Sequence, residues 1–250
     1  MAAVIGTNLS YILLAFLPPI IWLAFYTRED RNPEPKGLLF FVFLGGMLSA
    51  LLALAAECGW VATVAGSCRG AVRTGVSPLL VFAGISLIEE YVKYLPVKFF
   101  ALRRSAFDEP IDAMIYMMTA AMGFASLENL LFVLPVFHYS FFAGLEITTN
   151  RFLGANLLHA LSSGIVGFFL ARAFFSPRRH HFIALGVLIA SIFHTAFNYL
   201  ILTRSDIAQG TLYIILLLFV MAVMVLIDFE RLKKKKPAEE EPTGEGVGEK

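Results

Sequence analysis

The sequence is short of charged residues: Asp, Glu, Lys and Arg make up only 16% of its 250 residues, whereas 58% are hydrophobic. A soluble domain carries about a quarter charged residues and cannot hide this much apolar surface. The net charge of +1 also leaves no basic excess for a nucleic-acid partner. The composition therefore excludes an ordinary soluble domain and a nucleic-acid-binding protein, and it indicates a protein that lies in a lipid bilayer.

Long polar linkers are missing as well, because the apolar segments follow one another at short intervals. Crossing about 30 Å of hydrocarbon takes roughly 20 predominantly apolar residues in a helix. Seven segments meet this requirement, at residues 8–26, 37–57, 77–101, 113–133, 152–174, 182–202 and 211–228. We therefore predict an all-α, polytopic membrane helical bundle. It forms a single domain over residues 1–230, and residues 231–250 form a disordered cytosolic tail that is first basic and then acidic.

Lys and Arg are unevenly distributed between the two sides of this bundle. They gather in alternate connections, at residues 28–36, 98–104 and 172–179, and again in the tail at residues 231–236. The positive-inside rule then places the N-terminus outside and the C-terminus inside, which agrees with an odd number of spans. We expect a multi-pass protein of the cell (cytoplasmic) membrane.

Cysteine is scarce: Cys58 and Cys68 are the two in the chain, and both fall in the same predicted outer loop. An oxidising exterior would permit a disulfide between them. Two free thiols packed as small apolar residues are equally compatible with the sequence. Neither cysteine belongs to a metal-ligand pattern.

Three of the five histidines lie in predicted loops. His138 falls in the outer loop 134–151, and His180 and His181 fall in a basic cytosolic loop. We interpret all three as solvated loop residues without a role in a site.

Charged side chains interrupt the third predicted span. An ionisable residue in a membrane costs roughly 2.5–3.5 kcal/mol on the insertion scale, so it faces the bundle interior and usually marks function. Glu89 is i,i+4 and Glu90 is i,i+3 from Lys93. One carboxylate can pair with the ammonium while the other stays free to act as a general base or acid. The alternative is an internal ion pair that locks the packing of the helix.

Three further spans carry buried polar candidates. Glu128 and Asn129 lie near the outer end of the fourth span, His159 lies in the fifth, and His194 and Asn198 lie one turn apart in the sixth. A single intramembrane histidine is often only an interhelical hydrogen-bonding residue. At 1.5 Å per residue, however, the polar groups of all four spans lie roughly 8–18 Å below the outer surface. We therefore predict that they converge on one pocket.

These residues belong to a series of short motifs over about residues 28–200. In chain order the motifs are Glu89-Glu90-x-x-Lys93, Asp108-Glu109-Pro110-Ile111-Asp112, Gly123-Phe124-Ala125-Ser126-Leu127-Glu128-Asn129, His159 with Gly164, and His194-x-x-x-Asn198. With them the sequence resembles the PrsW family of intramembrane proteases, distant relatives of the CAAX-prenyl endopeptidases and bacteriocin-processing (CPBP) proteases. The segment Asn32-Pro33-Glu34-Pro35 also resembles the family, without an assignable role. One departure is Asn198, where relatives often have Asp.

The resemblance implies regulated hydrolysis of a peptide bond within or beside the membrane, as in the release of an anti-sigma factor from its anchor. The substrate would be a single-span membrane protein cut near its outer end. Glu89 or Glu90 would activate a water, and Lys93 would balance the other carboxylate. His194 and Asn198 would hold the oxyanion. Glu128 and His159 would orient the base, the water or a metal, and Asn129 completes the candidate set beside Glu128.

Metal dependence stays open on the sequence. Glu128, His159 and His194 could hold Zn²⁺ with water in a fourth position. Yet the chain has no His-Glu-x-x-His helix, and these ligands are dispersed over several spans. We favour a metal-free glutamate mechanism, with zinc as the alternative.

Two other functions are compatible with buried charges in a membrane. A proton- or ion-coupled transporter would also carry Glu, Lys and His near the midplane, but it usually shows internal repeats, which this sequence lacks. A non-catalytic membrane scaffold of the same fold is the second alternative.

Overall fold

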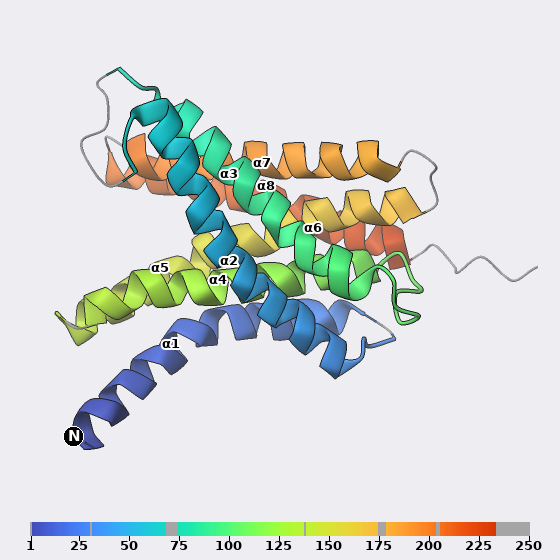
Figure 1. Cartoon of the computed structure of the whole chain (residues 1–250), viewed down its shortest axis with the longest axis horizontal. Coiled ribbons are helices and arrows are strands. Elements are labelled where there is room, and N and C mark those ends of the chain that lie inside the picture. The colour runs from blue at the N-terminus through green and yellow to red at the C-terminus, as the bar shows by residue number, and fades with distance from the viewer. Residues whose placement is uncertain are drawn as a thin grey trace, which may run out of the picture.

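The computed structural model describes residues 2–30, 32–68, 75–137, 139–174, 179–203 and 206–233; of residues 2–8, 174 and 179 it describes the backbone alone. The helices, in chain order, are α1 (Ala2–Tyr26), a 3₁₀ turn (Thr27–Glu29), α2 (Lys36–Ala65), α3 (Pro78–Pro96) continued by a π-helical turn (Val97–Ala101), α4 (Asp112–Phe137), α5 (Phe141–Leu153), α6 (Ala155–Phe174), α7 (Arg179–Thr203) and α8 (Ile207–Lys233). Figure 1 shows them as one bundle. The described residues contain no strand, and the predicted all-α polytopic membrane fold is confirmed.

The seven predicted spans fall on α1, α2, α3, α4, α6, α7 and α8. Six helical segments of the described residues are long and apolar enough to cross a membrane. Helix α3 is not among them because Glu89, Glu90 and Lys93 interrupt it, although its 19 residues reach about 28 Å. Large apolar side chains such as Leu48 and Phe219 are exposed on the outside of the bundle, as lipid-facing residues are. The orientation of the termini stays a prediction.

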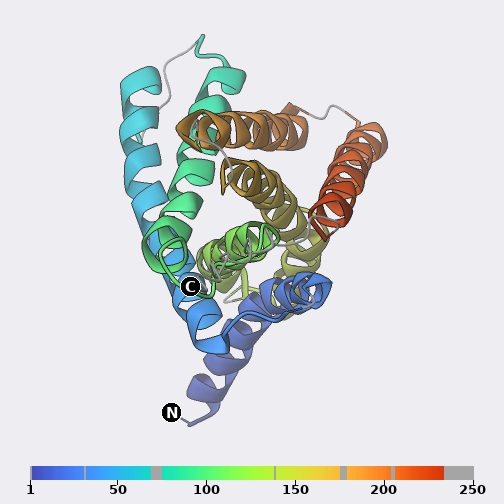
Figure 2. The same cartoon turned by 90° about the vertical axis from the view of Figure 1, so that its right-hand side faces the viewer.

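Helix α4 forms the centre of the bundle. It packs chiefly against α6, α2 and α1, which surround it in Figure 2. An ideal Cβ on Gly46 of α2 would lie 2.0 Å from the Ala120 carbonyl oxygen, and one on Gly123 of α4 would lie 1.9 Å from that of Phe43. The two glycines therefore let the backbones of α2 and α4 touch, which small residues allow between membrane helices.

Two connections differ from the prediction. Helix α2 continues to Ala65, so Cys58 lies in the helix and not in a loop. The predicted outer loop 134–151 is wrong, because α4 continues to Phe137 and α5 occupies Phe141–Leu153. Helix α5 begins after Ser140, whose Oγ accepts a hydrogen bond from the Ala143 backbone N–H at 3.3 Å. Such a cap satisfies one of the free donors at a helix start.

The two cysteines form a disulfide in the structure, with a Cα–Cα distance of 5.0 Å between Cys58 and Cys68. It joins the end of α2 to the segment that follows. Of the remaining sequence predictions, His180 and His181 are exposed as expected, but they lie in the first turn of α7 and not in a loop. His138 and the tail from residue 234 onward lie outside the described residues.

Candidate active site

Lys93 lies at the centre of a buried polar cluster. Its Nζ is 3.1 Å from Glu89 Oε2 and 2.9 Å from Glu90 Oε1 on the same helix, and 2.8 Å from His159 Nδ1 on α6. All four side chains are buried. The prediction that one glutamate stays free of the ammonium is therefore wrong. The i,i+3 and i,i+4 positions both bring a carboxylate within reach of the same Nζ.

Both imidazoles of the cluster are oriented by carboxylates. His194 Nδ1 lies 2.9 Å from Glu90 Oε1, and His159 Nε2 lies 2.7 Å from Glu128 Oε2. Since a carboxylate only accepts, these two nitrogens carry the protons and the opposite ring nitrogens present lone pairs. His159 Nδ1 and His194 Nε2 each lie 3.8 Å from Glu89 Oε2. Two unprotonated nitrogens and one carboxylate thus face a common point.

Glu90 is the fully buried anchor of this arrangement. Besides Lys93 and His194, Ser162 Oγ donates a hydrogen bond to Oε1 at 3.0 Å, and Ser163 Oγ donates one to Oε2 at 3.5 Å. Both oxygens of Glu90 are therefore occupied by donors. The sequence analysis did not find the two serines, although they follow His159 by three and four residues and so share its helix face.

Glu128 is held by Arg151 of α5. Arg151 Nη2 lies 2.7 Å from Glu128 Oε2, and its Nε donates to Asn129 Oδ1 at 2.5 Å. The Asn129 amide donates in turn to the Ala15 carbonyl oxygen of α1 at 3.0 Å. Asn129 therefore contacts the partner of Glu128 and not the reacting groups. Arg151 was also missed as a site residue, because its segment was predicted to be a loop.

A cavity of about 650 Å³ lies beside the cluster. The polar residues of its lining include Glu89, Glu128, His159, His194 and Asn198, and much of the remaining wall is apolar. Asn198 is half-buried one turn after His194, as expected from its spacing. A cavity with apolar walls and a few convergent polar groups is the usual form of a binding or catalytic site.

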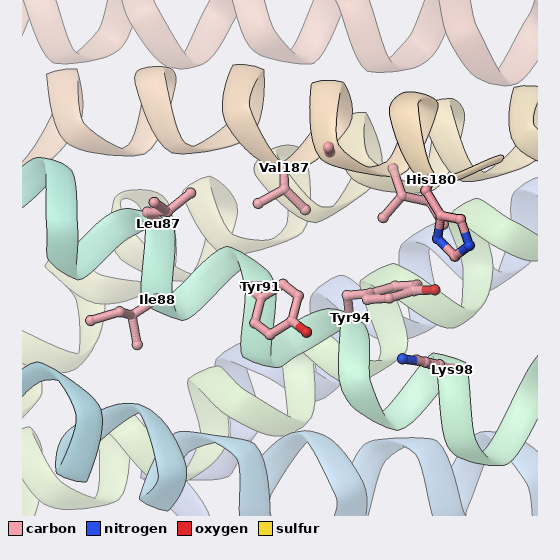
Figure 3. Close-up of a pocket in the computed structure, with 9 residues that line it drawn as sticks. Leu87, Ile88, Tyr91, Tyr94, Lys98, His180 and Val187 are labelled. Atoms are coloured by element: carbon pink, nitrogen blue, oxygen red, sulfur yellow. The ribbon is translucent and has the colours of Figure 1, made fainter. Parts of the chain in front are cut away.

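A second cavity, of about 770 Å³, lies between α3 and α7 (Figure 3). Leu87, Ile88 and Tyr91 of α3 line it together with Val187 of α7, and His180 lies at one end. None of the predicted catalytic residues lines it. Size alone would therefore assign the site to the wrong cavity, and the grouping of ionisable side chains identifies the smaller one as the candidate active site.

The cluster also has a donor set for a metal. Ligand atoms of Glu89, His159 and His194 lie within 4.8 Å of one another. The set predicted from sequence had Glu128 in place of Glu89. In the structure Glu128 Oε2 is engaged by Arg151 Nη2 and by His159 Nε2, the ring nitrogen opposite the one in the donor set. A metal-ligating histidine usually donates its other ring N–H to a carboxylate, as both histidines do here.

Two histidines and one carboxylate suit a catalytic zinc ion, which keeps its fourth position for water. Lys93 donates to the same His159 Nδ1 that an ion would use. This hydrogen bond and ion binding therefore exclude each other, whereas the bond from Lys93 to Glu90 is compatible with both. The donor types of Glu89, His159 and His194 fit a zinc ion.

Comparisons with known proteins identify the family of the chain. Residues 34–226 match the family described as PrsW family intramembrane metalloprotease. Protease PrsW of Geobacillus kaustophilus (strain HTA426) is 30% identical over 188 residues, which cover 72% of this chain and 74% of that protein. Protease PrsW of Clostridioides difficile (strain 630) is 26% identical over 234 residues, which cover 91% and 92%. No solved structure matches the chain. This multi-pass membrane protein belongs to the PrsW family of intramembrane proteases.

Proposed function

We propose that the chain hydrolyses a peptide bond of a single-span membrane protein, of the anti-sigma-factor kind, near the extracytoplasmic end of its span. The observation that carries the proposal is the convergence of Glu89, His159 and His194 at the wall of one cavity between the helices. Apolar walls suit an unwound stretch of a transmembrane segment, and the polar cluster supplies the groups that activate water.

Glu89 is the better candidate for the residue that activates water. It lines the cavity and is 6% exposed, whereas Glu90 is 0% exposed and both its oxygens are engaged by donors. A general base must reach the proton that it takes. Glu90 is then a positioning residue that orients His194, and Glu128 does the same for His159.

Asn198 is the candidate donor for the oxyanion. Its side chain lines the same cavity as Glu89, and its amide can donate to a carbonyl oxygen that gains charge. A fixed donor in a water-poor site is worth several kcal/mol to such a transition state. His194 can join it only when Nε2 carries a proton.

The cofactor is part of the proposal, and with it bound Glu89 would serve as a ligand and not as the base that takes the proton. Glu89, His159 and His194 would hold Zn²⁺, which supplies a Lewis acid and lowers the pKa of a bound water. Lys93 then keeps Glu90 charged and in place. Both the zinc-bound and the metal-free alternative need the carboxylate of Glu89, so its removal tests the site whichever applies.

The position of the cavity supports a cut near the extracytoplasmic end. Glu57 lines the cavity and directly precedes Cys58, which is disulfide-bonded. Disulfides persist in oxidising surroundings. The cavity therefore lies at the end of the bundle where the positive-inside rule predicts the exterior.

Glu89→Gln tests the proposal in cells that also produce a single-span reporter with tags on both sides of its span. We expect cleavage to fall by at least about a hundredfold, because a general base or metal ligand is lost while side-chain shape is kept. The matched control is Glu146→Gln, which neutralises an exposed glutamate of α5. Cleavage by Glu89→Gln at the rate of the control, with equal protein in the membrane, would reject the proposal.

A further inference from the structure

Three further carboxylates meet at the other end of α4. Asp30 follows the turn after α1, Glu34 precedes α2, and Asp112 is the first residue of α4. Their side-chain oxygens lie within 4.8 Å of one another. They are only 8%, 7% and 1% exposed. Asp112 lies 16 residues before Glu128, or roughly 24 Å along the helix, so this group is separate from the active site.

The negative charge of this group is not balanced by the described part of the chain. No ion pair joins Asp30, Glu34 or Asp112 to a Lys, Arg or His among the described residues. Burying a carboxylate without a partner is costly. Three within 4.8 Å of each other also repel when ionised, so the group must take up protons or bind a cation from outside this set.

The protein orients each of these carboxylates by one of its oxygens. Asp30 Oδ1 accepts from the Asn32 backbone N–H at 2.9 Å, and Glu34 Oε2 accepts from the Tyr116 hydroxyl. Asp112 Oδ2 accepts from two backbone N–H groups, those of residues 108 and 109, at 2.9 and 2.7 Å. These hydrogen bonds fix one oxygen of each carboxylate. Hydrogen bonds around metal ligands orient the ligands in the same way.

The second oxygen of Asp30 indicates that this group binds a ligand. Asp30 Oδ2 is buried and has no hydrogen-bond partner among the described residues. Buried polar atoms are nearly always partnered, and an exception calls for an unseen water or ion. Here the unpartnered atom belongs to the same three-carboxylate group that pairs with no cationic side chain among the described residues.

We propose that Asp30, Glu34 and Asp112 bind a hard divalent cation, Mg²⁺ or Ca²⁺. All three donors are carboxylate oxygens, the ligands that these ions prefer, and neither nitrogen nor sulfur is offered. The bound ion ties the α1–α2 connection to the first turn of the central helix. It gives a function to two motifs without a role in catalysis, residues 32–35 and 108–112.

Binding can be measured on the full chain in detergent or nanodiscs, in a His159→Ala/His194→Ala background that removes the nitrogen donors of the active site. The probe is Mn²⁺, followed by electron paramagnetic resonance, with Mg²⁺ and Ca²⁺ as separate competitors. We expect one saturable site that either competitor empties, and the stronger competitor identifies the ion. Asp30→Asn and Asp112→Asn each weaken Mn²⁺ binding at least about tenfold.

Asp108→Asn is the matched control, because it removes one nearby negative charge from an exposed side chain outside the group. It should change the Mn²⁺ affinity far less than Asp30→Asn does. Thermal unfolding distinguishes a variant that has lost the ion from one that is misfolded. In chelator, Asp30→Asn should melt no lower than the parent, because it relieves repulsion, and it should lose the stabilisation that the parent gains from Mg²⁺ or Ca²⁺.

Two results would overturn the proposal. One is the absence of a saturable site, or a site that Asp30→Asn and Asp112→Asn leave intact. The other concerns Arg31, which lies outside the described residues but adjoins Asp30 in sequence. If the parent binds no cation and Arg31→Gln destabilises it to the same degree as Asp30→Asn, the charge balance comes from the protein itself.

Discussion

Two groups of carboxylates lie at two levels of α4, roughly 24 Å apart along the helix, and they differ in how their charge is balanced. In the active site Glu89, Glu90 and Glu128 stand against Lys93 and Arg151, which leaves one negative charge when both imidazoles are neutral. In the group of Asp30, Glu34 and Asp112 the described residues supply no cation, so every carboxylate that ionises there adds an uncompensated negative charge.

The difference shows two uses of buried charge in one membrane protein. The active-site lysine and arginine are fixed parts of the fold, and the remaining negative charge faces a cavity where chemistry can take place. The other group has its backbone and hydroxyl donors, but the part of the chain that the structure describes gives it no fixed cation. We infer that the first site is preorganised by the chain and that the second is completed by an ion.

The largest effect should come from removing the fixed cation of the active site. Lys93→Met leaves two buried carboxylates uncompensated, and breaking a buried ion pair in this way costs about 3–5 kcal/mol. We expect a large drop in thermal stability in detergent and the loss of reporter cleavage. Lys98→Met is the matched control, because Lys98 is exposed on the following turns. Equal stability of the two variants would contradict the view that Lys93 balances the glutamates.

Metal removal should separate the two groups by the ions that they prefer. Two imidazoles with a carboxylate suit zinc or another transition metal, whereas a set of carboxylates alone suits Mg²⁺ or Ca²⁺. We therefore expect a zinc chelator to abolish cleavage in purified membranes, and added Zn²⁺, but not Mg²⁺ or Ca²⁺, to restore it. His194→Ala should not be restored. Undiminished cleavage after exhaustive chelation would support the metal-free glutamate mechanism instead.

The smallest effect concerns pH, in chelator, at the group without a fixed cation. Burial raises the pKa of Asp30 and of Glu34. The nearby charge of Asp108 acts in the same direction on both, and that of Glu109 does so on Asp30. A carboxyl whose pKa is raised by folding stabilises the folded state while it is protonated, and this stabilisation is lost as pH rises through the folded pKa.

The melting temperature in chelator should therefore fall as pH rises above the ordinary carboxyl range of about 4. Asp30→Asn should flatten this dependence, and saturating Mg²⁺ or Ca²⁺ should remove most of it. A melting temperature that rises over the same interval would show that these carboxyls are stabilised in their charged form by groups of the protein.

Much of the active site could be found from the sequence because charge is rare in an apolar helix. Glu89, Glu90 and Lys93 stand out for that reason, and His159 and His194 stand out in the same way. Ser162 and Ser163 could not be found, because serine is common in membrane helices and only its contact with Glu90 gives it meaning. Arg151 was missed because α5 looked like a loop.

Composition alone determined that this chain lies in a membrane as a bundle of helices, since apolar runs of about 20 residues have few other solvents. It also determined which side chains are too costly to bury without a purpose. Tertiary structure decided which of them meet: that Glu89 and not Glu128 faces both histidines, that Lys93 binds two glutamates, and that Asp30, Glu34 and Asp112 form one group. Distances across a bundle depend on how its helices cross, and glycine contacts such as those of α2 with α4 set that crossing.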